Sequence, residues 1–244
     1  MVTDTLLGVG ILVLVTTAVL WAYQAPQRFA PALAVLRGTA QLAAISFVLG
    51  GVIREPLWVA AALIVMYVVA AITATRRVGW SGRKLGLVGG AMASGIAVSL
   101  SIVFLTGALA LTSRYALAIG GIVIGNAMTF ATLAGRRFLE LVDDGWDHVE
   151  GWLALGATPR QATRTFARRA LHAAMIPSTD QTKTTGLVTL PGAFVGAIFG
   201  GVSPLEAGRF QIVVLAAIMA AGSITAVVII IGLAAVRHRP HPSD

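Results

Sequence analysis

The chain has 244 residues, of which 57% are apolar and 11% charged, whereas soluble domains carry about a quarter charged residues. This composition and the mean hydropathy of +0.86 exclude a soluble enzyme, a disordered chain and an ordinary nucleic-acid-binding domain. The formal net charge of +8 is therefore expected on loops at the cytoplasmic side of a lipid bilayer. Because there is no cysteine, disulfides and thiolate metal sites are excluded.

Seven apolar runs divide the chain, at residues 6–23, 32–53, 57–75, 87–111, 116–134, 186–201 and 210–236. All but the sixth are long enough to cross a bilayer as a helix. The sixth contains Pro191, so it either begins earlier or is a broken helix. The pattern predicts an all-α, polytopic membrane protein with about seven transmembrane helices in one domain, residues 1–244.

Basic residues predict the orientation of these helices. With the N-terminus outside, fourteen of the eighteen Lys and Arg residues fall in inside segments and three fall outside. This asymmetry favours an outside N-terminus and a cytoplasmic C-terminus in the cell membrane. The first residues, MVTDTLLGVG, lack the basic region of a signal peptide, so the first run is expected to stay as a helix.

The segment 135–185, between the fifth and sixth runs, is polar and carries two helical patterns. Its first part has apolar residues three and four apart, which is typical of an amphipathic helix: Phe138, Val142, Trp146, Val149 and Leu153. Gly156 ends this helix, and Thr158 begins another, with Pro159 at its first position and Gln161 completing a capping box. We expect a helix–turn–helix at the cytoplasmic face.

A basic ridge follows on the second helix, since Arg160, Arg164 and Arg168 are spaced four apart. The ridge could rest on anionic lipid or bind a protein partner. An acidic first helix would be repelled by anionic headgroups, which favours the protein partner.

Polar residues inside the apolar runs are candidates for a transport path, because each is costly in lipid. Arg37 and Gln41 share one face of the second run, and Asn126 and Thr129 share one face of the fifth. Arg37 could instead snorkel to the headgroups, and the fifth-run pair could hydrogen-bond between helices. With the expected break around Pro191, these residues are predicted to border one polar cleft.

Glycine spacing predicts close helix contacts, within the chain or in a homodimer. Two sets show small-xxx-small spacing: Gly121 with Gly125, and Gly192, Gly196 and Gly200.

No catalytic, cofactor or metal site is expected in this chain. The phosphate-binding pattern GxxxxGK[ST] is absent, so an ATP-driven transporter would need its ATPase on another chain. No Asp or Glu lies in any of the seven runs, which weakens a proton-coupled carrier.

Three stretches carry a resemblance to a known family: IGGIVIGNAMTFATLAGRRFLE, VEGWLALGATPRQATR and IPSTDQTKTTGLVTLPGAFVGAIFGGVSPLEAGRFQIVVL. They resemble the FetB/YbbM family of ABC-transporter permeases, to which plant aluminium-tolerance proteins are also similar. The resemblance implies a non-enzymatic membrane subunit that exports a metal, iron in the bacterial case. It also implies two permease chains paired with two cytoplasmic ATPase chains.

The resemblance further implies that the polar segment couples the spans to the ATPase. Import-type ABC permeases carry an EAA-xxx-G loop, and here Glu150 and Gly156 match it while Gly151 and Trp152 replace the alanines. The implied coupling residues are Glu150, Gly156, Ala157, Thr158, Pro159, Arg160 and Arg164. An ATP-independent channel or secondary transporter, and a membrane scaffold that holds a cytoplasmic partner, stay open as alternatives.

Overall fold

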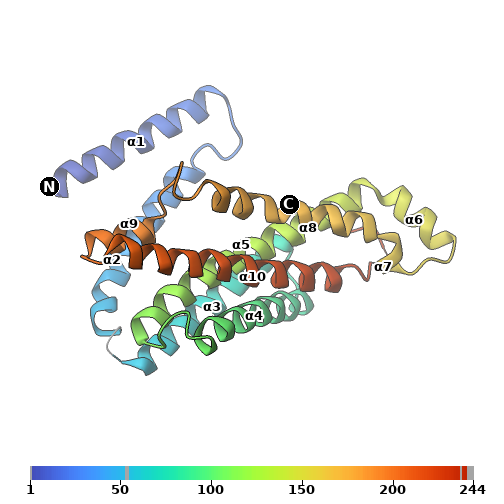
Figure 1. The fold of residues 1–244 in the computed structure, drawn as a ribbon. Coiled ribbons are helices and arrows are strands. Elements are labelled where there is room, and N and C mark those ends of the chain that lie inside the picture. The colour runs from blue at the N-terminus through green and yellow to red at the C-terminus, as the bar shows by residue number, and fades with distance from the viewer. Residues whose placement is uncertain (1, 53–54, 237, 241–244) are drawn as a thin grey trace. The chain divides into compact units, whose positions relative to one another are not determined.

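The computed structural model describes residues 2–52, 55–236 and 238–240, and over these residues the regular structure is helical (Figure 1). One isolated bridge, between Thr185 and Thr189, interrupts the helices. The chain divides into two compact units, Met1–Glu55 and Pro56–Asp244.

The first unit is a pair of helices, α1 (Val2–Ala22) and α2 (Ala30–Val52). The connection between them turns through Gln24 and Gln27, which both have positive φ. Large apolar side chains stay exposed on both helices, for example Leu12 at 68% and Leu36 at 68%. A helix that is apolar all round is typical of a membrane environment.

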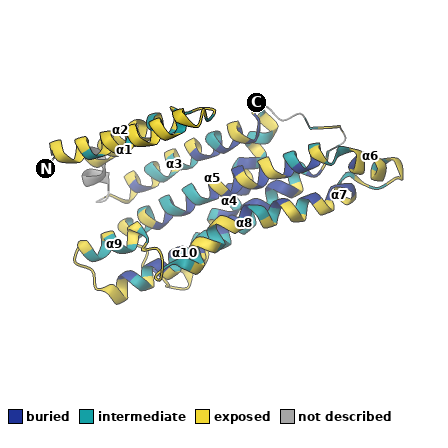
Figure 2. Ribbon diagram, turned by 90° about the horizontal axis from the view of Figure 1, so that it is seen from above, coloured by how far each residue is buried: buried dark blue, intermediate teal, exposed yellow. Residues whose placement is uncertain are grey.

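Within its described residues, the second unit is a bundle of eight helices. They are α3 (Pro56–Val78), α4 (Gly82–Leu105), α5 (Ser113–Asp144), α6 (Trp146–Ala154), α7 (Pro159–Ala162), α8 (Arg164–Thr184), α9 (Gly192–Phe199) and α10 (Pro204–Leu233). The central pair is α5 and α10; α3 packs on α5, α4 packs on α10, and α8 lies along both α5 and α10. Figure 2 shows the buried positions on the facing sides of these helices.

Hydroxyl caps begin three of the long helices of the second unit. The side chains of Ser81, Thr112 and Ser203 each accept a hydrogen bond from the backbone N–H three residues later. Each cap satisfies one of the N–H groups that a helix start leaves without a partner. The caps therefore fix where α4, α5 and α10 begin.

Small residues bring α10 close to its two main neighbours. A Cβ on Gly222 would meet the ring of Phe130 on α5, and a Cβ on Gly95 of α4 would meet the carbonyl of Ala221. The hydroxyl of Ser99 donates to the carbonyl of Ala217 at 2.9 Å, which also joins α4 to α10. These contacts make the spans pack by shape and by interhelical hydrogen bonds, as membrane helices do.

Five helices among the described residues are long and apolar enough to cross a membrane: Thr3–Ala22, Pro56–Val78, Gly82–Leu105, Ser113–Asp144 and Pro204–Leu233. Seven spans were expected. The helix α2 is not among these five, and the sixth run contains only the eight-residue α9. The structure thus supports an all-helical, multi-pass membrane protein and shows that the sixth run is not one continuous helix.

Candidate functional site

The structure turns sharply at the end of α5, where α6 and α7 form a corner. The helix α5 ends at Gly145, where a Cβ would collide with the ring of Phe166. The helix α6 follows, and Gly156, with a φ of +88°, turns the chain into α7. Because few residues other than glycine accept this φ, Gly156 sets the bend of the corner.

A capping box stiffens the start of α7, as the sequence predicts. Thr158 Oγ1 accepts from the backbone N–H of Gln161, and Gln161 Oε1 accepts from the backbone N–H of Thr158. Pro159 occupies the first helical position. Thr163 then breaks the helix before α8, so Arg160 lies on α7 while Arg164 and Arg168 lie on α8.

The corner is anchored from beneath by apolar side chains. Val149 is fully buried, and Ala162 and Phe166 are nearly so; all three belong to one core cluster with the ends of α5 and α10. The expected apolar stripe is confirmed at Phe138, Val142 and Val149, although Gly145 divides it between α5 and α6. The corner is therefore packed against the ends of α5 and α10 and forms part of the bundle.

The outer side of the corner presents both apolar and charged groups. Leu155 is 83% exposed and Trp152 is 49% exposed, and Trp152 Nε1 lies 3.1 Å from His148 Nε2. A hollow of ≈590 Å³ lies on this surface, lined by His148, Trp152, Leu155, Gly156, Ala157, Gln161, Ala162, Arg164 and Thr165. Exposed Leu and Trp beside charged residues are typical of a protein-binding surface.

The predicted coupling residues lie on or beside this corner. Glu150 is exposed on α6, and Gly156, Thr158 and Arg160 are exposed around the turn; Ala157 and Pro159 are half-buried. Arg164 is exposed at the start of α8 and lines the hollow.

The C-terminal segment reaches the same end of the bundle. Arg239 Nε donates to Asp143 Oδ1 at 2.5 Å, and Arg239 Nη2 donates to the Asp143 carbonyl at 3.4 Å. The Asp143 carboxylate raises the pKa of Arg239 through this hydrogen bond and through its charge. These contacts hold the segment against the end of α5.

The structure differs from the expectation of a separate loop over residues 135–185. Residues 135–144 continue α5, only α6 and α7 form the corner, and α8 runs back along α5 and α10 (Figure 1). The sequence predicts a helix here but not its packing along the spans, because the average hydrophobicity of α8 is low. Its small apolar residues nevertheless form one buried side, with Phe166, Ala170 and Ala174 four residues apart.

One acidic side chain, Asp180, lies on α8, the helix that packs against α5 and α10. Ala174 of α8 packs in one cluster with Ala134 of α5 and Ala226 of α10. Asp180 lies six residues further along α8, beyond Pro177, and its side chain is exposed. The apolar runs contain no Asp or Glu, and Asp180 lies on a helix outside those runs that packs against two of them.

The predicted path residues occupy two separate units. Arg37 and Gln41 are exposed on α2 of the first unit. In the second unit, Asn126 Nδ2 donates to the Ile122 carbonyl at 2.8 Å, and Thr129 Oγ1 donates to the Gly125 carbonyl at 3.2 Å. Asn126 and Thr129 thus bond within their own helix.

Residues 185–191 separate α8 from α9. Pro191 is the half-buried N-cap of α9. Gly186, with a φ of +88°, donates its N–H to the Thr189 carbonyl. Leu187 is 92% exposed and Val188 is 78% exposed, so this break presents apolar side chains outward.

The predicted packing glycines differ in their surroundings. A Cβ on Gly121 would meet Met66 of α3, whereas none on Gly125, Gly192 or Gly196 would meet another described atom within 4 Å. On Gly200 it would meet only carbonyls of its own turn. Their role in a contact with a second chain stays a prediction.

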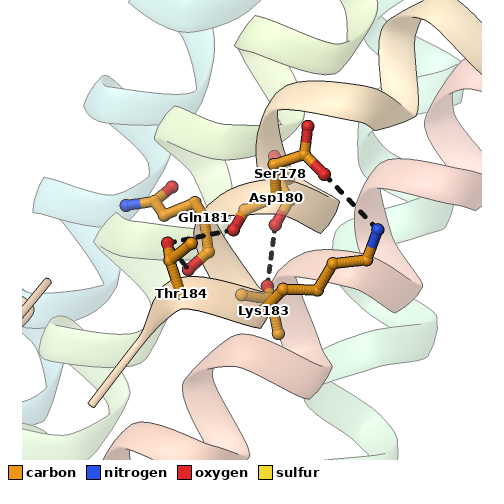
Figure 3. Close-up of polar contacts among 6 residues, drawn as sticks. Ser178, Asp180, Gln181, Lys183 and Thr184 are labelled. Carbon is orange, nitrogen blue, oxygen red and sulfur yellow. Dashed lines mark hydrogen bonds and ion pairs between the residues drawn. The ribbon is translucent and has the colours of Figure 1, made fainter. Parts of the chain in front are cut away.

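Sequence reasoning missed the polar group at the end of α8. Lys183 Nζ lies 3.4 Å from Asp180 Oδ1, and the hydroxyls of Thr182 and Thr184 donate to the carbonyls of Ser178 and Asp180 (Figure 3). The four-residue repeat of Phe166, Ala170 and Ala174 was the available signal. Among the described residues, no three His, Cys, Asp or Glu side chains gather as metal ligands.

The fold and the surface together define a multi-pass, all-helical membrane protein with a seated corner at one end of its bundle. Over residues 3–237 the chain matches the model of the Uncharacterised protein family (UPF0014). The chain belongs to this family.

Named relatives add detail. The chain is 37% identical to "UPF0014 membrane protein STAR2" of Oryza sativa subsp. japonica, over 80% of this chain and 69% of that one. It is 36% identical to "Protein ALUMINUM SENSITIVE 3" of Arabidopsis thaliana, over 79% and 71%. It is 33% identical to "Probable iron export permease protein FetB" of Escherichia coli (strain K12), over 57% and 53%. No solved structure matches the chain.

Proposed function

We propose that the chain is the permease subunit of an ABC transporter that exports a metal, iron in the first instance. The name of the Escherichia coli relative, a probable iron export permease, supports transport and the metal. In this proposal the ATP is bound by a separate cytoplasmic ATPase, and two permease chains pair in the membrane.

The observation that carries the proposal is the corner formed by α6 and α7. An ATPase can drive a membrane path only through an element that is both exposed to it and rigidly joined to the spans. The corner has exposed Leu155 and Trp152 on one side and buried Val149 and Phe166 on the other. Force on the exposed side would pass through Phe166 to the ends of α5 and α10.

The proposed topology places this corner in the cytoplasm. Seven crossings, with the N-terminus outside and the C-terminus inside, follow from the distribution of basic residues. In this arrangement α8, the break and α9 together form the sixth crossing. The residues assigned to the coupling surface are Glu150, Gly156, Ala157, Thr158, Pro159, Arg160 and Arg164.

The test is a reconstituted complex of the permease with the ATPase encoded beside it. Glu150→Lys reverses an exposed charge on the corner, and we expect it to abolish solute-stimulated ATP hydrolysis while the chain still reaches the membrane. Glu206→Lys is the matched control, because Glu206 is an exposed acid at the start of α10. It should retain stimulation.

Full stimulation in the Glu150→Lys complex would contradict coupling through the corner. Binding of the ATPase without any solute-stimulated hydrolysis in the unmodified complex would favour the scaffold. Solute movement by the permease alone would favour an ATP-independent channel or carrier.

A further inference from the structure

The helix α8 has one side against the bundle and another side that no described residue of the second unit covers. The buried side holds Phe166, Ala170 and Ala174. The exposed side, which we term the outer face of α8, has residues three and four apart, all of them exposed: Arg169, His172, Ile176, Asp180 and Lys183. Apart from Ile176, the outer face is polar, and the buried side opposite it extends from Phe166 to Ala174.

In the proposed topology, the charges at the far end of the outer face, Asp180 and Lys183, lie at the level of the apolar spans. Phe166 packs at Gly145, near the end of α5, and α8 then runs back along α5. Asp180 lies about 21 Å from Phe166 along the helix axis. Both α5 and α10, its neighbours here, qualify as membrane spans.

The ion pair at this level is open to its surroundings. Lys183 Nζ and Asp180 Oδ1 are 3.4 Å apart, and their side chains are 70% and 61% exposed. Figure 3 shows Gln181 extending in another direction, and it is exposed as well. The hydroxyls of Thr182, Thr184 and Thr185, in contrast, donate hydrogen bonds to backbone carbonyls of α8.

Lipid cannot cover the outer face at a low free-energy cost. A charged residue at the centre of a membrane helix costs about 2.5–3.5 kcal/mol on insertion scales, and such residues face a water-filled cavity or another polar group. The outer face has two such charges within one helical turn. Water is the surrounding that satisfies Asp180, Gln181 and Lys183 together.

The charge of α8 also indicates the sign of a solute. Four of its side chains are basic and one is acidic, so with His172 neutral its formal balance is +3. The basic residues Arg164, Arg168 and Arg169 are all exposed at the corner end, ahead of Lys183. On α5, Arg136 and Arg137 are paired with Glu140. A surface of one sign raises the local concentration of oppositely charged solutes.

We propose that the outer face of α8 lines a water-filled conduit for a small anionic solute. Carboxylate or phosphate groups define this class, including a metal held in an anionic carboxylate complex. The basic residues near the corner attract the solute, and Lys183 binds it while Asp180 keeps Lys183 in place. The solute's passage rests on the proposed transport function; the aqueous face does not.

The test uses the absence of cysteine from the natural chain. Ile176→Cys places one thiol on the outer face, at a side chain that is 43% exposed. Val65→Cys is the matched control, because Val65 is 61% exposed on the apolar span α3. His172→Cys provides a second position on the outer face. The full-length variants are labelled in native membranes with membrane-impermeant methanethiosulfonates, one anionic (sulfonatoethyl) and one cationic (trimethylammonioethyl).

We expect Ile176→Cys and His172→Cys to react and Val65→Cys to stay unlabelled until the membrane is dissolved. Relative to a free thiol in solution, the anionic reagent should be favoured about tenfold at Ile176→Cys. Adding Lys183→Gln should reduce this preference, and adding Asp180→Asn should increase it.

Two results would overturn the proposal. Labelling of neither outer-face thiol before the membrane is dissolved would show that lipid or protein covers the face. Equal or cationic preference at a reactive Ile176→Cys would reject an anionic solute. Neither result depends on an ATPase, so loss of coupling in the reconstituted complex and failure of this proposal are separate outcomes.

Discussion

The helices α10 and α8 lie side by side but are held in the bundle in different ways. α10 is apolar along its length and packs through glycine and alanine onto α4 and α5. α8 is held by one apolar side that begins at Phe166, and its other side is charged. The comparison indicates that α10 mainly stabilises the fold. In α8 fewer side chains are buried, and the exposed ones form a polar surface.

The largest expected effect on stability comes from removing the buried ring of Phe166, which packs α8 against the end of α5. Phe166 is 8% exposed and contacts the end of α5, so Phe166→Ala should lower the free energy of unfolding by about 3–5 kcal/mol. Unfolding of the purified chain in mixed micelles measures this. Phe199→Ala makes the same change at a side chain that is 86% exposed and should have little effect. Equal losses of unfolding free energy in the two variants would contradict the claim that burial of Phe166 stabilises the packing of α8.

A smaller loss is expected where α10 meets α5. A methyl group on Gly222 would overlap the buried ring of Phe130, and overpacking of this kind costs about 1–3 kcal/mol. Gly222→Ala should therefore lower the unfolding midpoint in the same micelles. Gly125→Ala is the control, since no described atom lies within 4 Å of its added Cβ. An unchanged midpoint for Gly222→Ala would contradict the close approach.

The smallest expected effect concerns the joint between the corner and α8. Thr158→Ala removes the side chain that caps α7, which should cost about 1 kcal/mol. Thr158→Ser keeps the hydroxyl and should retain most of the stability. If the serine variant lost as much as the alanine variant, the capping hydrogen bond would not be the cause.

The sequence predicted those features that depend on local patterns. The capping box at Thr158 and the buried stripe through Phe138, Val142 and Val149 follow from spacing alone. The five long spans follow from their apolar composition. Each of these features depends on residues that are close to one another in the sequence.

The packing of α8 along α5 and α10 could not be predicted from local sequence patterns. Its residues are polar on average. The side chains that pack it against the bundle are mainly alanines, which are common on any helix surface. Only its packing on α5 and α10 places α8 beside two spans, so that Asp180 lies at their level in the proposed topology. Burial of one side of a helix depends on partners that are distant in the sequence.

The central claim is that α8, the break and α9 form one crossing of the membrane. Labelling of intact cells with an impermeant maleimide tests it most directly, using single cysteines at Val202, between α9 and α10, and at Ala157, in the corner. The account predicts that Val202→Cys is labelled from outside and that Ala157→Cys is labelled only after the cells are opened. Labelling of both positions from the same side would contradict it.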